Sequence, residues 1–170
     1  MSTLGKILYG LLTGLTFMQS GASLFAISVN ISSLIQSPPA SLVLAKGPYA
    51  FNPDIFWEKF PPLVLLILFL CLIFNWKTSL RKWILAGGTL WILSGVVVFL
   101  LLSPVQTEFL SVEYSEALDE NLIELGKKWR NHSILFMGLS ALSGFVYIFG
   151  LSNTRIKEKR ATTMAKDHPA

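Results

Sequence analysis

Few side chains of this chain could take part in acid–base chemistry, and two that could act together are Trp129 and His132. They lie three positions apart, where a charged run meets the last long apolar stretch, so a helix would place them one turn apart on one face. An imidazole exchanges protons near neutral pH, and an indole can stack on a flat aromatic molecule. We therefore predict a catalytic pair with His132 as the base. The structural alternative is an interfacial tryptophan anchor beside a solvated histidine.

Polar side chains that could line a binding pocket occur on the first and last apolar stretches. The candidate lining residues are Gln19, Ser23 and Asn30 in the first stretch and Phe136 and Ser140 in the last. In each stretch they recur at helical spacing, and the second set shares the face of His132. Two such faces would enclose an apolar pocket with a few polar groups, which is typical of a site for a small lipophilic aromatic ligand. Alternatively, these polar groups hydrogen-bond to neighbouring helices and only hold the bundle together.

The sequence offers no ligand set for a metal ion or a haem. The two histidines are His132 and His168, the second almost at the C-terminus, and the single cysteine, Cys71, lies in an apolar run. Zinc, copper and haem sites need several such ligands close together. Glycine loops that bind phosphates and the motif of nucleophilic serine hydrolases do not occur either. We expect no metal, no cofactor and no nucleic-acid partner.

The composition favours the bilayer as the solvent of this chain. Of the 170 residues, 52% are hydrophobic and 14% are charged, and the mean hydropathy is +0.57. A membrane span needs roughly 20 apolar residues, and four stretches qualify, at about 7–34, 60–76, 83–102 and 132–152. We predict an all-α fold, an integral membrane four-helix antiparallel bundle that forms a single transmembrane domain of residues 1–170. A cleaved signal peptide is the alternative for the first stretch, although apolar sequence continues well past the small residues near position 21.

The connections between the predicted spans differ in character. Residues 36–39 and 46–48 contain prolines and glycine that break helices, and residues 76–82 are short enough for a tight hairpin. Residues 103–131 mix acidic and apolar side chains, which predicts a short extracytoplasmic helix before the last span. Residues 153–170 form a basic tail.

Charges divide unequally between the two sides that four spans create. The side with the N-terminus, the second connection and the tail has nine basic and two acidic residues, a net 9 − 2 = +7. The other side has five basic and eight acidic residues, a net 5 − 8 = −3. The positive-inside rule then predicts that both termini are cytoplasmic and that His132 lies in the extracytoplasmic half.

Small residues mark a second face of the first span. Gly10, Gly14 and Gly21 lie opposite the polar face, and this spacing lets another helix approach closely. We therefore expect either a homo-oligomer or a partner membrane protein on this face. From the apolar spans we expect membrane lipid around the bundle.

Several short motifs carry a resemblance to a known family. They are the polar, glycine-rich first span, the hairpin of the second and third spans, Ser103-Pro104-Val105-Gln106, the acidic segment, and Lys128-Trp129-Arg130-Asn131-His132. Together they resemble the anthrone-oxygenase-like family of small four-span membrane proteins. Fungal members that resemble this pattern oxidise anthrones to anthraquinones with molecular oxygen and no cofactor, and most bacterial members have no assigned function.

The resemblance implies a cofactor-free, monooxygenase-like protein of a bacterial cell membrane that acts on a lipophilic aromatic compound. It implies that Trp129 and His132 form the site and that Gln106 lines it. A second four-span family, which resembles a transmembrane protein linked to drug resistance, has a similar layout and no assigned chemistry. A non-catalytic binding, transport or structural role is therefore the alternative.

Overall fold

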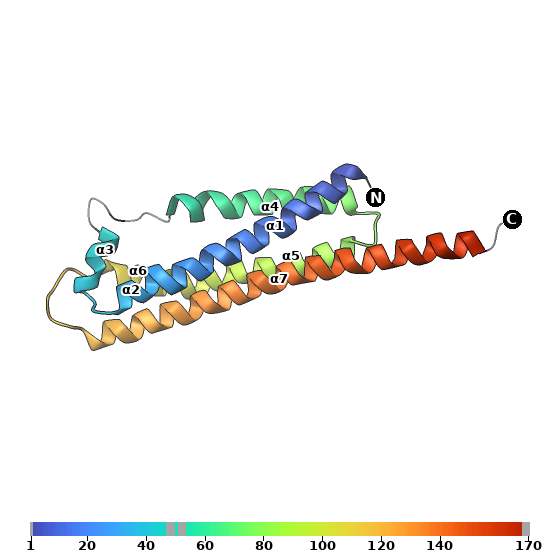
Figure 1. Ribbon diagram of the computed structural model, residues 1–170. Coiled ribbons are helices and arrows are strands. Elements are labelled where there is room, and N and C mark those ends of the chain that lie inside the picture. The colour runs from blue at the N-terminus through green and yellow to red at the C-terminus, as the bar shows by residue number, and fades with distance from the viewer. Residues whose placement is uncertain (1, 47–49, 51–53, 168–170) are drawn as a thin grey trace.

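The computed structural model describes residues 2–46, 50 and 54–167, and within them every regular element is a helix (Figure 1). In chain order the elements are α1 (Thr3–Phe25), η1 (Ala26–Ile31), α2 (Ser32–Ile35), η2 (Ala40–Leu42), α3 (Val43–Lys46), α4 (Asp54–Asn75), α5 (Arg81–Val97), η3 (Val98–Leu102), α6 (Ser103–Ser111) and α7 (Glu120–Asp167). The η2 segment is a 3-10 turn, whereas η1 and η3 are π-helical segments inside longer helical runs. The all-α prediction is confirmed.

Four helical runs are long and apolar enough to cross a membrane. They are Thr3–Ile35, Phe56–Asn75, Arg81–Ser111 and Glu120–Thr154. Each run corresponds to one predicted span, and all four extend beyond it, the second only at its N-terminal end. Polar residues near the membrane surface can continue a helix because its backbone hydrogen bonds are made within the helix.

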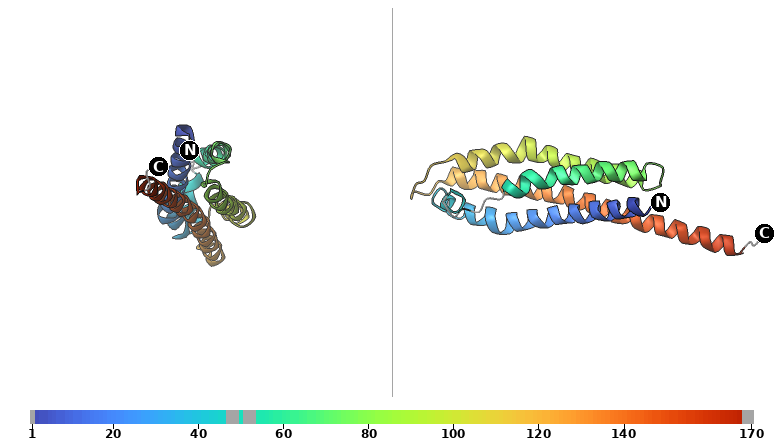
Figure 2. Two further views of the ribbon diagram at one scale, coloured as in Figure 1. Left: turned by 90° about the vertical axis from the view of Figure 1, so that its right-hand side faces the viewer. Right: turned by 90° about the horizontal axis from the view of Figure 1, so that it is seen from above.

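The long helices form an antiparallel bundle. The α1, α5 and α7 helices pack together, and α4 lies mainly against α1 (Figure 1, Figure 2). The N-terminus and the α4–α5 hairpin share one end, here called the hairpin end, and the α2–α3 segment and the α6–α7 connection share the other, the loop end. The α7 helix projects beyond the other helices at the hairpin end. The predicted four-helix bundle is therefore present.

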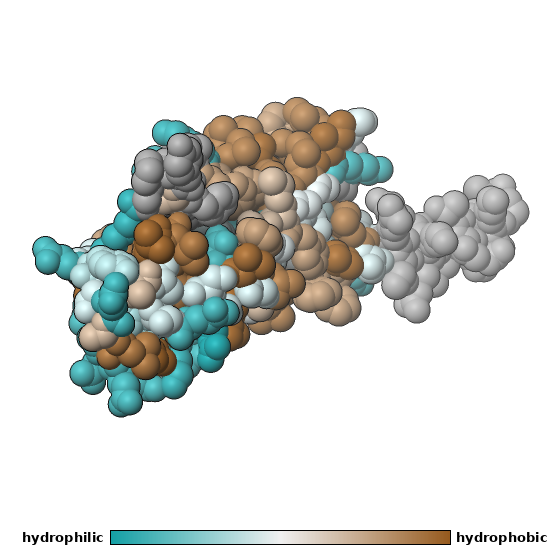
Figure 3. All heavy atoms as spheres, turned by 60° about the vertical axis from the view of Figure 1, so that its left-hand side comes forward, coloured by the Kyte–Doolittle hydropathy of each residue, from teal (hydrophilic) through white to brown (hydrophobic). Residues whose placement is uncertain are grey.

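The outer surface of the bundle is apolar. Figure 3 shows hydrophobic residues over the body of the bundle and hydrophilic residues gathered toward the loop end. Large side chains point outward, with Phe69 64%, Phe99 78% and Phe149 62% exposed. Such a surface would drive aggregation in water, whereas in hydrocarbon these side chains are well solvated. The fold thus presents a lipid-facing surface.

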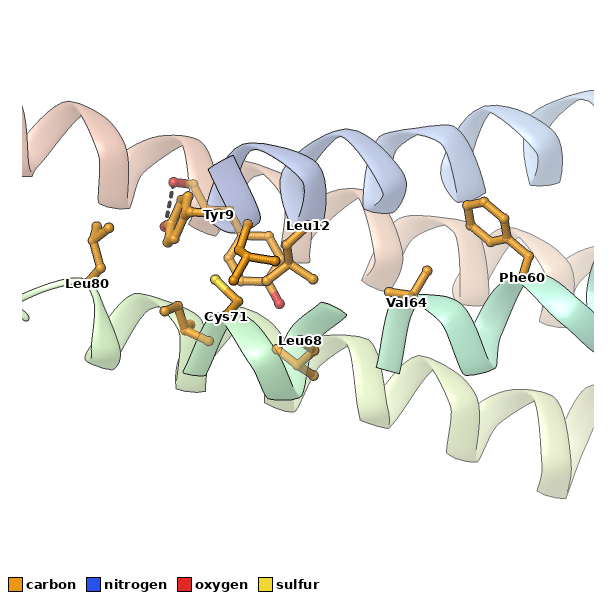
Figure 4. Packing of buried hydrophobic residues seen from close by; sticks show 10 residues of the cluster. Tyr9, Leu12, Phe60, Val64, Leu68, Cys71 and Leu80 are labelled. Carbon is orange, nitrogen blue, oxygen red and sulfur yellow. Dashed lines mark hydrogen bonds between the residues drawn. The ribbon is translucent and has the colours of Figure 1, made fainter. Parts of the chain in front are cut away.

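The buried core near the hairpin end is cross-linked by hydrogen bonds between helices (Figure 4). The Tyr9 hydroxyl donates to the Tyr147 carbonyl at 2.8 Å, and the two rings meet edge to face at 5.8 Å. The Tyr147 ring lies against Gly87, where any Cβ would overlap the ring. The Asn75 amide donates to the Gly5 carbonyl at 3.1 Å and so joins α4 to α1. These contacts fix how α1, α4, α5 and α7 are rotated relative to one another.

The α4–α5 connection and the helix before the last span agree with the predictions. The α4 helix ends at Asn75 and α5 begins at Arg81, which confirms the tight hairpin. The short helix before the last span is α6, and it continues directly from η3. Pro104 has no backbone N–H to donate within this continuous run, and it lies two residues after the π-helical segment η3.

At the loop end, the segment that follows α2 is partly helical and contacts the α6–α7 connection. The Asp119 amide donates to the Pro38 carbonyl at 3.1 Å, so the α6–α7 connection is joined to the segment after α2. Of the predicted helix breakers, Gly47 and Pro48 lie outside the described residues, as does His168. The α7 helix continues beyond Thr154, where its membrane-length run ends, so the predicted basic tail is helical as far as Asp167.

Candidate functional site

The start of α7 carries the two residues that the sequence singled out. Asp119 precedes the helix, and its carboxylate accepts from the amides of Asn121 and Leu122 at 2.9 and 3.2 Å. A carboxylate at this position satisfies free N–H groups and complements the positive end of the helix. This cap starts α7 nine residues before Trp129, so Trp129 and His132 both lie within a continuous helix.

Two π-helical segments lie on either side of this part of α7. The η1 segment contributes Ile27 and Ile31 to the core cluster of Trp129, and η3 contributes Leu102. The hydroxyl of Ser32, directly after η1, donates to the Ile27 carbonyl at 2.8 Å, five residues back, which matches the wider turn. Widened turns of this kind are rare and often occur at functional sites. The loop-end half of the bundle therefore has the locally altered backbone that a site requires.

His132 is half-buried, and its ring is held by the backbone of η3. The Nδ1 atom lies 3.0 Å from the carbonyl oxygen of Leu101. Since a carbonyl can only accept, Nδ1 carries the hydrogen, and in the neutral ring Nε2 is left with its lone pair. The contact thus orients the imidazole and leaves Nε2 as a proton acceptor.

Trp129 lies in the core of the bundle. Its side chain is 7% exposed, and its ring meets that of Phe109 at 5.5 Å with an angle of 49°. Close approach of α6 is possible because residue 126 is glycine, and a Cβ there would come within 2.9 Å of the Phe109 ring. The indole is therefore occupied by packing contacts within the bundle, where we had expected a surface for an aromatic ligand.

Phe136 lies one turn below His132 and joins α4 to the same cluster. It is buried, and Trp57 from the start of α4 meets it edge to face at 5.9 Å. The two tryptophans and Phe136 fill the space between helices at this level. The predicted lining residue Phe136 thus packs against protein.

The polar residues predicted to line a pocket form hydrogen bonds deeper in the bundle. The Gln19 carbonyl oxygen accepts from the Trp91 indole at 2.9 Å, across α1 and α5. Ser23 donates to the backbone of Gln19 at 2.9 Å, and Ser140 donates to Ser94 at 3.3 Å, across α7 and α5. The Gln19–Trp91 and Ser140–Ser94 bonds match the alternative interpretation, in which polar groups hold helices together, whereas the Ser23 bond stays within α1.

Asn30 and Gln106 lie at the same end of the bundle as His132. Asn30 is half-buried in η1, and Gln106 is half-buried in α6. Both of these elements contact α7. The two residues are separated from Gln19 and Ser140, which lie farther toward the middle of the bundle. The structure thus divides the predicted residues into two groups, one at the loop end and one in the bundle interior.

Neither of two hollows among the described residues has His132 in its lining. One is an open apolar depression between α4 and α5, which includes Trp91 and Gly95. The other is a polar hollow at the α4–α5 hairpin. Within the described residues, no group of three or more histidine, cysteine, aspartate or glutamate side chains is placed to hold a metal ion.

The sequence patterns did not identify the residues that contact the candidate site residues within the bundle. Leu101 takes part through its carbonyl, which no side-chain pattern reveals. Trp91 and Phe109 have no local signal that distinguishes them from the other aromatic residues in apolar stretches. An amphipathic pattern shows which face is polar but leaves the residue on the facing helix undefined.

The four membrane-length helices and the apolar outer surface define the class of the chain, which is an integral multi-pass membrane protein. Comparisons with family models, curated proteins and solved structures found no match.

Proposed function

We propose that this chain binds a lipophilic aromatic compound at the loop end of the bundle and acts on it as a cofactor-free, oxygenase-like enzyme. The observation that carries the proposal is the His132 imidazole, which is anchored through Nδ1 to the Leu101 carbonyl and keeps Nε2 for proton transfer. The resemblance to the anthrone-oxygenase-like family supports the same residue.

The chemistry requires one base and a lipid-soluble oxidant. His132 Nε2 would remove a proton from an acidic carbon of a phenolic substrate, and the resulting carbanion would give its electrons to molecular oxygen. Loss of water from the oxygenated product leaves a ketone, so each substrate consumes one O2 and releases one H2O. General-base catalysis of this kind contributes typically 100-fold to 10,000-fold in rate.

Trp129 has a positioning role in this proposal. Its indole packs against Phe109, about one helical turn before His132 on α7. Asn30 and Gln106, half-buried at the same end, are the polar groups that would contact the phenolic oxygens. Substrate would enter sideways from the bilayer, because the outer surface of the bundle is apolar.

The test uses the purified full-length chain in detergent with an anthrone, following oxygen uptake and quinone absorbance. In His132→Asn the amide can still donate to the Leu101 carbonyl, but the base is lost, so turnover should fall at least about 100-fold. His168→Asn removes the other histidine and should keep full activity. Absence of turnover in the unmodified chain, or full turnover in His132→Asn, would refute the enzyme function.

A second candidate function is that of a non-catalytic partner protein in the membrane, bound through α1. The observation that favours it is the open space above Gly10, Gly14 and Gly21, where an added Cβ would meet no atom within 4 Å. That face is free for a close contact with a helix of a second copy or of another membrane protein.

This candidate is tested by assembly. Gly14→Leu should abolish a complex that is seen by cross-linking and by light scattering in detergent. Gly138→Leu is the matched control, because Gly138 on α7 also has open space around its Cα. Equal complexes in both variants would exclude the α1 face as the contact.

We also propose that both termini face the cytoplasm of a bacterial cell. The support is the charge difference between the two sides, +7 for the hairpin end and tail (9 − 2) against −3 for the loop end (5 − 8). Fusion of a fluorescent protein that matures only in the cytoplasm to the C-terminus should give bright cells. A dark fusion with an active periplasmic reporter at the same position would reverse the orientation.

A further inference from the structure

The α4–α5 hairpin forms a polar hollow at the membrane surface, outside the candidate site. Its lining residues are Trp76, Lys77, Thr78, Ser79, Arg81 and Lys82. Three of the six are cationic, two carry hydroxyls, and the lysines and the arginine are exposed. Such a set of donors suits an anion with several oxygen atoms.

Aromatic rings hold two of the cations in place. The Arg81 guanidinium lies 5.0 Å from the centre of the Trp76 ring, and the Lys82 ammonium lies 5.5 Å from the Trp83 ring. Tryptophans next to the end of a span prefer the headgroup level of a bilayer. The charges are therefore held at the depth of lipid phosphates.

The backbone of the hairpin adds to the positive potential. The Thr78 hydroxyl donates to the Asn75 carbonyl at 2.8 Å and accepts from the Leu80 amide at 3.3 Å, so the turn is ordered. The α5 helix starts directly after it without a side-chain cap. The amides of Arg81 and Trp83 donate to the carbonyls of Thr78 and Leu80, so the start of α5 contributes mainly the positive end of its helix dipole.

Acidic side chains that could neutralise these cations are absent from the neighbouring sequence. Between Glu58 and Glu108 the chain has no aspartate or glutamate. Among the described residues, the ion pair that forms is Lys127 with Glu124, on the opposite end of the bundle. No acidic residue of α4 after Glu58, of the hairpin or of α5 therefore competes with an anionic ligand for these cations.

We propose that the hairpin hollow binds the phosphate group of an anionic phospholipid. The chemistry recognised is a phosphate that accepts from Lys77, Arg81 and Lys82 and from the Ser79 hydroxyl. A free phosphate ion presents the same oxygens, but the hollow lies beside the apolar flank of α4 and α5, where acyl chains continue from a lipid phosphate. We therefore assign the lipid as its source.

The test is native mass spectrometry of the full-length, delipidated chain, titrated with phosphatidylglycerol or with phosphatidylcholine. The test variant is Lys77→Gln/Arg81→Gln/Lys82→Gln. The matched control is Arg155→Gln/Lys157→Gln/Lys159→Gln, which removes the same charge from the tail. Each lost cation should lower the apparent affinity for phosphatidylglycerol about five-fold, or about 100-fold for three. The tail variant should bind as the unmodified chain does.

Three outcomes would overturn the assignment. Equal losses in the hairpin and tail variants would mean that general surface charge binds the lipid. Equal binding of phosphatidylcholine and phosphatidylglycerol would show that the hairpin cations do not select an anionic lipid. Inorganic phosphate that displaces the lipid at millimolar concentration and binds equally well alone would assign the hollow to the free ion. Circular dichroism of both variants verifies that the helices are intact.

Discussion

Two tyrosines that pack against each other should respond in opposite ways to the loss of one oxygen atom. Tyr9 and Tyr147 are both fully buried, and each can be changed to phenylalanine without removing its ring. The Tyr9 hydroxyl donates to the Tyr147 carbonyl at 2.8 Å. Within the described residues, the Tyr147 hydroxyl is buried without a hydrogen-bond partner. The pair therefore isolates a satisfied from an unsatisfied polar group in one core.

The magnitudes follow from these contacts. Tyr9→Phe removes one hydrogen bond between helices, which in membrane proteins is worth about 0.6 kcal/mol on average. Tyr147→Phe removes a buried group whose desolvation costs about 1–3 kcal/mol, so the variant should be more stable than the unmodified chain. The two variants should differ by about 1.6–3.6 kcal/mol, or about 15-fold to 400-fold in the unfolding equilibrium constant.

The assay is reversible unfolding by sodium dodecyl sulfate in mixed micelles, followed by far-ultraviolet circular dichroism. The control is Tyr114→Phe, since Tyr114 is 66% exposed and should give no change. An equal loss of stability in Tyr9→Phe and Tyr147→Phe would refute the reasoning. It would mean that the Tyr147 hydroxyl has a partner, such as the Ser143 hydroxyl one turn earlier on α7 or a buried water.

Four further single substitutions test the packing. Gly87→Ala should destabilise the bundle by about 1–3 kcal/mol, because the added methyl overlaps the Tyr147 ring, whereas Gly14→Ala, with open space, should be neutral or stabilising in the same unfolding assay. Gln19→Leu should lose about 1–3 kcal/mol by leaving the Trp91 indole N–H without its acceptor, and a Gln19→Leu/Trp91→Phe double variant should recover part of it. Trp129→Ala should cost about 3–5 kcal/mol through the cavity left beside Phe109, and an unchanged unfolding midpoint would contradict its core position.

The span positions could be predicted because they depend on local properties of the chain. A run of about 20 apolar residues is sufficient to define a membrane helix, whichever neighbour it packs against. Residues such as Trp76 and Arg81 mark the ends of α4 and α5 in the sequence as well as in the structure. The continuation of the third helical run through η3 into α6, and the start of α7 at Glu120, were not predicted, since polar residues outside the bilayer continue a helix as readily as they end it.

The candidate site could be predicted only in part. The sequence placed His132 and Trp129 within one turn of each other, and α7 keeps them there. We expected the Trp129 indole to face a ligand, but in the structure Phe109 on α6 packs against it. The π-helical segments η1 and η3 were not predicted either, because they contain residue types that also occur in ordinary α-helices.

The sequence by itself determined the all-α class, the four spans, the hairpin between α4 and α5 and the unequal charge of the two ends. These features follow from hydrophobicity and charge within short stretches. Only the tertiary structure decided that Gln19 bonds to Trp91, 72 residues away, and that the His132 ring is held by the backbone of Leu101. Such pairs depend on how each helix is rotated and packed against its neighbours, and that rotation results from the fit of whole helix faces.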